Sequence, residues 1–93
     1  SHLPHVVAYA LAGTLKKEYA KYTSTGFKDT TRIASSDPVL WSDVFLSNKD
    51  NVLESIRGFR NIVEKIEDDI RNGREQELKE RLGLCKGIRD EIV

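Results

Sequence analysis

The chain is poor in several residue types, and each scarcity narrows what the protein can be. Its 93 residues include one cysteine, two prolines and no methionine. A single thiol, Cys85, cannot close a disulfide within the chain, and no cluster of cysteine and histidine has the spacing of a zinc site. We therefore expect no bound metal, and a reduced compartment with a cytoplasmic location.

Neither sign of charge dominates. The sequence has 15 Lys and Arg against 15 Asp and Glu, which leaves a formal net charge of zero. Domains that bind nucleic acid usually carry a basic excess or a basic stripe, so we expect no nucleic acid partner. No apolar run approaches the roughly 20 residues of a membrane span, so we expect no membrane partner. From the missing methionine we expect Ser1 to be a processed end or a cut inside a longer protein.

Apolar residues recur at steps of three and four along most of the chain, which is the periodicity of helices packed on one face. No segment alternates with a period of two, as a half-buried strand would. At this length one domain is expected, over residues 1–93. The predicted fold class is all-α, a bundle of about five helices. These helices are expected over residues 2–22, about 27–34, 38–48, 49–72 and 75–92.

Two helix ends carry specific signals. Asp37 followed by Pro38 is typical of a helix start, because the carboxylate caps free N–H groups and proline suits the first turn. Asn72 followed by Gly73 is suited to a helix end, since both residues tolerate the left-handed conformation of a C-cap.

Chemically versatile residues gather near the first predicted helix and just after it. Lys28 and Arg32 are four apart, so on a helix they project from one face, and a small ligand with two carboxylates would satisfy both. The alternative is an exposed basic pair, or a bridge from Arg32 to Asp29 or Asp37.

Three other side chains have structural alternatives as well. His5 is a hydrogen-bond partner, a proton carrier or a helix-start residue. Trp41 in a helix is more often core than ligand contact. Cys85 is expected to be an inert buried thiol. The residues alone define a helical domain with a candidate anion site.

Three motifs give the sequence a likeness to a known family, the C-terminal domain of the prephenate and arogenate dehydrogenases. They are Ser1-His2-Leu3-Pro4-His5, Gly26-Phe27-Lys28-Asp29-Thr30-Thr31-Arg32-Ile33-Ala34, and Ser36-Asp37-Pro38 with Leu40-Trp41. Their order and spacing make the resemblance specific. It implies a single helical C-terminal domain that resembles the dimerisation domain of 6-phosphogluconate dehydrogenase.

The resemblance implies an oxidoreductase of tyrosine biosynthesis as the parent protein. Such an enzyme oxidises and decarboxylates prephenate to 4-hydroxyphenylpyruvate, or uses arogenate instead. NAD or NADP would be bound mainly by an N-terminal dinucleotide-binding domain that this chain lacks, and the catalytic histidine would lie there too. We therefore expect no catalytic residue, and no catalysis by this chain alone.

The family pattern also implies roles for particular residues in a homodimer. His5, Lys28 and Arg32 would bind the substrate, with Ser1 at the pocket edge. Trp41 would reach in from the partner subunit, and Asp29 would belong to an ionic network at the site mouth. The alternative hypothesis is a non-catalytic helical interaction module whose motifs are only caps and packing residues.

Overall fold

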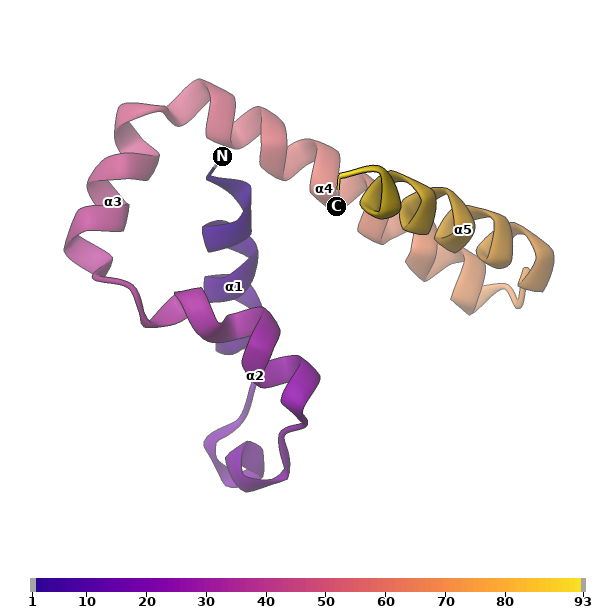
Figure 1. Cartoon of the computed structure of the whole chain (residues 1–93), viewed down its shortest axis with the longest axis horizontal. Helices are drawn as coiled ribbons and strands as arrows, with labels where there is room; N and C mark the ends of the chain where they lie inside the picture. Colours follow the sequence, from indigo (N-terminus) through magenta and orange to yellow (C-terminus); the bar gives the residue numbers. More distant parts are fainter. Residues whose placement is uncertain (1, 93) are drawn as a thin grey trace. The chain divides into compact units, whose positions relative to one another are not determined.

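The computed structural model describes residues 2–92 and confirms the all-α class, since no strand occurs among these residues. Five α-helices and two short 3₁₀ segments follow one another along the chain (Figure 1). They are α1 (Leu3–Gly13), η1 (Lys17–Tyr22), α2 (Thr25–Thr31), η2 (Arg32–Ser35), α3 (Pro38–Ser47), α4 (Lys49–Arg71) and α5 (Glu75–Glu91).

The elements form two compact units, the first ending at Ile56 and the second beginning at Arg57. In the first unit, α1 packs against α2 and η2. Ala8 of α1 and Val52 of α4 are its buried apolar residues, only 1% and 6% exposed. A small side chain at Ala8 lets neighbouring backbone approach α1 closely, so this helix is the element around which the first unit is built.

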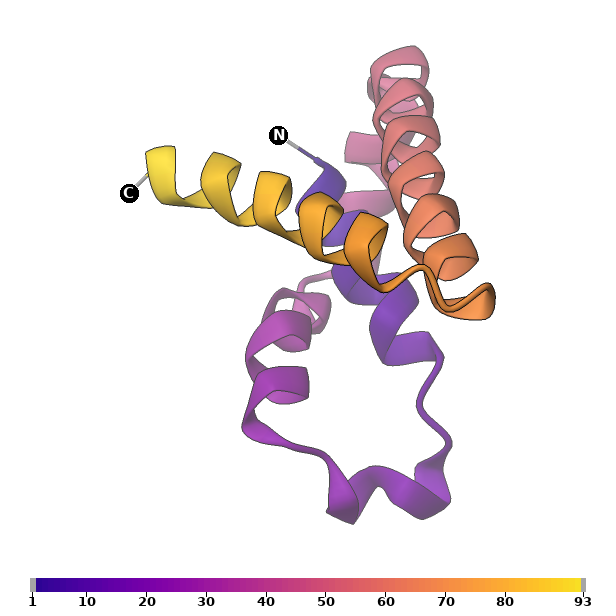
Figure 2. The ribbon, with the colours of Figure 1, turned by 90° about the vertical axis from the view of Figure 1, so that its right-hand side faces the viewer.

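The predicted first helix, over residues 2–22, is too long, because α1 ends at Gly13. Glycine is a poor helix former, and the next residue, Thr14, bonds back through its hydroxyl to the Leu11 carbonyl at 2.7 Å. Lys16 is then extended, with ψ of 135°. Residues 14–24 therefore leave α1 and return to α2 as an open loop that contains η1 (Figure 2).

Both predicted helix-end signals are confirmed. The Asp37 carboxylate accepts a hydrogen bond from the Val39 backbone N–H at 3.0 Å, which caps α3. At the end of α4, Gly73 has φ of +63°, and the N–H of Arg74 donates to the Asp69 carbonyl at 2.9 Å. This six-to-one bond is that of a Schellman motif, which turns the chain into α5.

A buried ion pair joins the two helices of the second unit. Asp69 of α4 is 2% exposed, and one of its carboxylate oxygens accepts a hydrogen bond from Arg81 Nε of α5 at 2.8 Å. Arg74 lies 3.8 Å from the other oxygen. The helix periodicity did not single out Asp69, because only its burial distinguishes it from the surface carboxylates around it.

We predict that Asp69→Ala destabilises the chain by about 3–5 kcal/mol, because it leaves Arg81 without its partner in a partly buried position. The matched control is the neighbouring Asp68→Ala, which removes only an exposed pair with Arg71 and is expected to cost about 0–1 kcal/mol. Urea unfolding of the variants measures both. Equal losses would show that burial does not strengthen the Asp69 interaction.

Candidate functional site

The centre of the candidate site is a stack of two rings from different helices. His5 of α1 and Trp41 of α3 lie face to face, with ring centroids 3.4 Å apart and planes 15° from parallel. Offset-stacked and edge-to-face aromatic pairs add roughly 0.5–1.5 kcal/mol beyond their buried area. The stack therefore holds α3 against α1 at the residue that the sequence proposed as a substrate contact.

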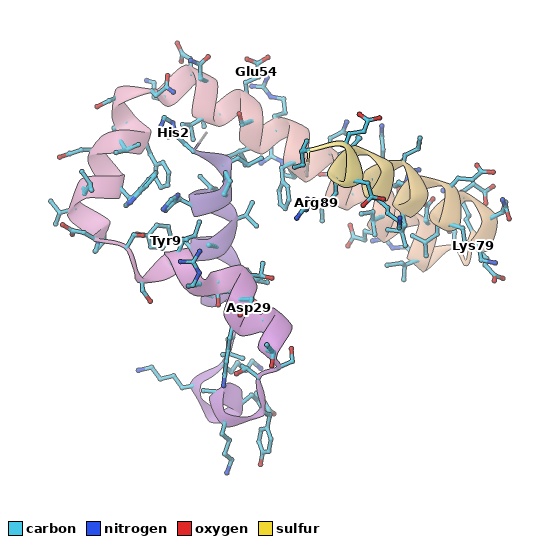
Figure 3. All side chains as sticks on the ribbon, viewed as in Figure 1. His2, Tyr9, Asp29, Glu54, Lys79 and Arg89 are labelled. Atoms are coloured by element: carbon cyan, nitrogen blue, oxygen red, sulfur yellow. The ribbon has the colours of Figure 1, made fainter. Side chains whose placement is uncertain are left out.

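Further aromatic side chains continue from this stack. Phe45 lies 5.7 Å from Trp41 between ring centroids, and Tyr9 meets Phe45 edge to face at 6.5 Å. His2, at the start of α1, approaches Trp41 by its edge at 6.1 Å. Figure 3 labels His2 and Tyr9 along α1. The side chains of α1 and α3 thus form one continuous aromatic row.

Tyr9 anchors the segment that leads into α3. Its hydroxyl donates a hydrogen bond of 2.8 Å to the Ser36 carbonyl, 27 residues away in sequence. Ser36 immediately precedes the N-cap Asp37, so the bond holds the start of α3 near α1. This role was missed by the sequence reasoning, which treated Tyr9 as part of no motif. Only contacts distant in sequence reveal it.

His5 carries an unusual polar atom. Its Nδ1 is buried, and no described residue forms a hydrogen bond with it. A buried polar atom without a partner costs about 1–3 kcal/mol, so such atoms are commonly satisfied by water, a ligand or another chain. His5 is therefore packed between α1 and α3 and is more than an exposed helix-start residue.

The two predicted cationic side chains, Lys28 and Arg32, are exposed and form no ion pair within residues 2–92. Lys28 lies on α2 and Arg32 begins η2, so the expectation that one helix carries both is only partly right, since α2 ends at Thr31. Within residues 2–92, neither forms an ion pair with an acidic side chain. Asp37, one alternative partner of Arg32, is instead used as the α3 cap.

The structure brings only part of the predicted site together. α2 and η2, which carry Lys28, Asp29 and Arg32, pack against α1, which carries His5. Asp29 is exposed on α2 (Figure 3). Trp41 contacts His5 of its own chain, and its contribution from a partner subunit stays a prediction. Ser1 lies outside the described residues.

An apolar groove of about 510 Å³ opens beside the aromatic row. It lies within the first unit, between α1, α3 and the first turns of α4. Lys49 is the charged residue on its wall. The groove is lined by Val6, Tyr9, Ala10, Phe45, Leu46, Lys49, Val52, Leu53 and Ile56.

Other kinds of site find no support in the described part of the chain. Residues 2–92 contain no group of three or more His, Cys, Asp or Glu side chains that could hold a metal ion. The helices in this range are too short or too polar to cross a bilayer. Cys85 is exposed, so its predicted burial is wrong.

The fold and site therefore define an all-helical domain that presents an aromatic row, an unsatisfied histidine and two free cations. A family model described as "Prephenate dehydrogenase, dimerization domain" matches residues 1–84. The chain belongs to this family, which confirms the resemblance carried by the three sequence motifs.

Characterised relatives agree with this placement. The chain is 32% identical over 96 residues to a prephenate dehydrogenase of Bacillus subtilis (strain 168), covering 97% of this chain and 26% of the relative. It is 38% identical over 66 residues to a cyclohexadienyl dehydrogenase of Zymomonas mobilis, covering 63% of this chain and 22% of that one. The chain thus spans about a quarter of the length of these relatives.

A solved structure has the same fold. The crystal structure of Synechocystis arogenate dehydrogenase superimposes with a TM-score of 0.88 at 29% sequence identity. The match covers 100% of this chain and 36% of that one. The helical arrangement is therefore shared with part of a larger dehydrogenase.

We predict that Tyr9→Phe lowers the free energy of unfolding by about 1 kcal/mol, because the Ser36 carbonyl loses its part-buried donor. Tyr22→Phe is the matched control, since that tyrosine is 72% exposed and its hydroxyl forms no hydrogen bond with residues 2–92. Chemical denaturation compares the two. A control variant as unstable as Tyr9→Phe would mean that the Ser36 bond contributes nothing specific.

Proposed function

We propose that this chain is the dimerisation and substrate-binding part of a dehydrogenase that acts on prephenate or arogenate. The family match over residues 1–84 is the observation that carries the proposal. The named relatives include prephenate, cyclohexadienyl and arogenate dehydrogenases, so the substrate class is a cyclohexadienyl carboxylate. NAD or NADP would be held outside the described residues, as would the catalytic histidine.

The chemistry of the site residues suits such a substrate. Arg32 offers a planar fork that can donate two parallel hydrogen bonds to a carboxylate, and Lys28 offers a point charge. Neither is neutralised by an acidic side chain within residues 2–92, so both charges are available to an anion. His5 would contact the pyruvyl or alanyl side chain of the substrate, as the family pattern implies.

The two carboxylates of prephenate explain why two cations are needed. A dianion loses its water shell on binding, and that loss is offset when each carboxylate meets a charged donor. Asp29, next to Lys28 on α2, would orient the cations at the mouth of the site. Trp41 stacks on the His5 ring of its own chain, and the Trp41 of a partner subunit would reach the substrate, as the family pattern implies. Together these residues bind and orient the substrate, and they exchange no hydride with it.

The second role is assembly, as a homodimer in the cytoplasm. The second unit leaves large apolar side chains on the surface of both its helices. On α4 these are Phe59, Ile62, Val63 and Ile70; Leu82, Leu84 and Ile88 lie on α5, and Ile92 is its C-cap. A two-helix hairpin has no third layer to cover such faces, and each buried Ile or Leu contributes about 1.5–3 kcal/mol. A second copy of the same hairpin would supply the missing layer.

The substrate role predicts a large effect of one substitution in the intact parent enzyme. Arg32→Ala should lower kcat/KM for prephenate or arogenate by about 10- to 150-fold, the value of a hydrogen-bonded charge partner. Arg60→Ala, an exposed arginine of α4, is the matched control and should leave kcat/KM unchanged. Steady-state kinetics measure both. An Arg32→Ala enzyme with wild-type kcat/KM would favour the non-catalytic interaction module.

The assembly role is tested by sedimentation at micromolar concentration, where the chain should have the mass of a dimer. Ile88→Asp places a charge on the apolar face of α5 and should weaken the dimer by about 100-fold, since an unpaired charge resists burial. Gln76→Asp, on the polar surface of the same helix, should leave the dimer intact. A monomeric wild-type chain would contradict the assembly role.

A further inference from the structure

We propose that His2 is a positioning residue, which forms with Asn48 a latch that keeps His5 face to face with Trp41. The consequence for substrate binding rests on the function proposed above. The latch itself is a property of this chain alone.

The latch joins two points that are far apart in sequence. Asn48 Nδ2 lies 3.3 Å from His2 Nδ1, across a separation of 46 residues. Asn48 stands between the last residue of α3 and the first residue of α4, and its carbonyl accepts the Val52 N–H at 3.0 Å. The contact therefore ties the start of α1 to the junction of α3 and α4.

A second asparagine orients the first. Asn51 Nδ2 donates a hydrogen bond of 2.9 Å to Asn48 Oδ1. Because this bond occupies the Asn48 carbonyl oxygen, the Asn48 amide nitrogen is the group directed at His2. With the amide in this orientation, Asn48 Nδ2 is the donor and His2 Nδ1 the acceptor. The hydrogen bonds thus run in one direction, from Asn51 through Asn48 to His2.

The latch matters for the site because the stack has no directional bond of its own. Within residues 2–92, neither the His5 ring nor the Trp41 ring forms a hydrogen bond. Stacked rings slide over one another at little cost, so their relative position is decided by what surrounds them. The rings of His2 and Trp41 are arranged edge to face, with their centroids 6.1 Å apart, and the His2 ring is held by Asn48. The latch thus restrains a ring that contacts the stack.

The surroundings of the latch allow it to be removed without loss of the fold. A polar hollow of about 170 Å³ lies beside it, lined by His2, Asn48, Asn51, Val52 and Ser55. Water can enter such a hollow and bond to the groups that a truncation leaves. Variants at Asn48 should therefore fold, with the stack loosened.

Trp41 is the only tryptophan of the chain, so its fluorescence reports on the stack directly. In Asn48→Ala, Trp41 emission should shift to longer wavelength and be quenched more by acrylamide. Hydrogen exchange of the Val6 amide, which is bonded to the His2 carbonyl, should accelerate about two- to tenfold, the ratio for one lost hydrogen bond. Asn61→Ala, an exposed asparagine further along α4, is the matched control.

His2→Phe separates the hydrogen bond from ring packing, because it keeps an aromatic edge against Trp41 and removes the acceptor. It should behave like Asn48→Ala. A wild-type spectrum and exchange rate in His2→Phe or in Asn48→Ala would overturn the latch.

Kinetics of the intact parent enzyme test the consequence for binding. Both latch variants should raise KM for prephenate or arogenate with little change in kcat. The reason is that a loosened stack misplaces a side chain that binds the substrate, while it leaves the groups that transfer protons where they are. A shifted Trp41 spectrum with unchanged KM would reduce His2 to a structural residue and overturn the positioning role. A wild-type enzyme that ignores both substrates would refute the proposed function, while the spectra would still decide whether the latch exists.

Discussion

The stack of Trp41 on His5 is the contact on which the first unit depends. It joins α3 to α1, as the Tyr9–Phe45 contact also does, and the α1 helix that carries His5 packs against the elements that carry Lys28 and Arg32. A ring face covered by another ring is shielded from water, so polar bonds made at its free edge are strengthened. The same contact therefore builds the fold and prepares the candidate site.

Little else in the first unit is buried. Ala8 and Val52 are its buried apolar residues, and an open apolar groove runs along α1, α3 and α4. The second unit relies on one buried ion pair, between Asp69 and Arg81, while its larger apolar side chains face outward. Small domains with few buried apolar residues commonly gain stability from association with another chain. That is the physical sense in which membership of a dimerization-domain family fits the structure.

The predicted site was only partly accessible from the sequence. The motif residues His5, Lys28 and Arg32 were recognisable because charged and imidazole groups clustered in a chain whose other half is plain amphipathic helix. Tyr9 and Asn48 were not, because each acts through a partner 27 or 46 residues away. Local spacing carries no information on such pairs. Cys85 shows the reverse error: its apolar stripe suggested burial, but the stripe faces outward.

The sequence by itself determined the helical class, the caps at Asp37 and Gly73, and the family, since periodicity, cap chemistry and motif order are all local in the chain. Tertiary structure alone decided that Trp41 covers His5 and that Asp69 is buried against Arg81. These outcomes depend on which helix faces pack together. Periodicity predicts that a helix has an apolar face, but only the packed structure shows which residues that face contacts.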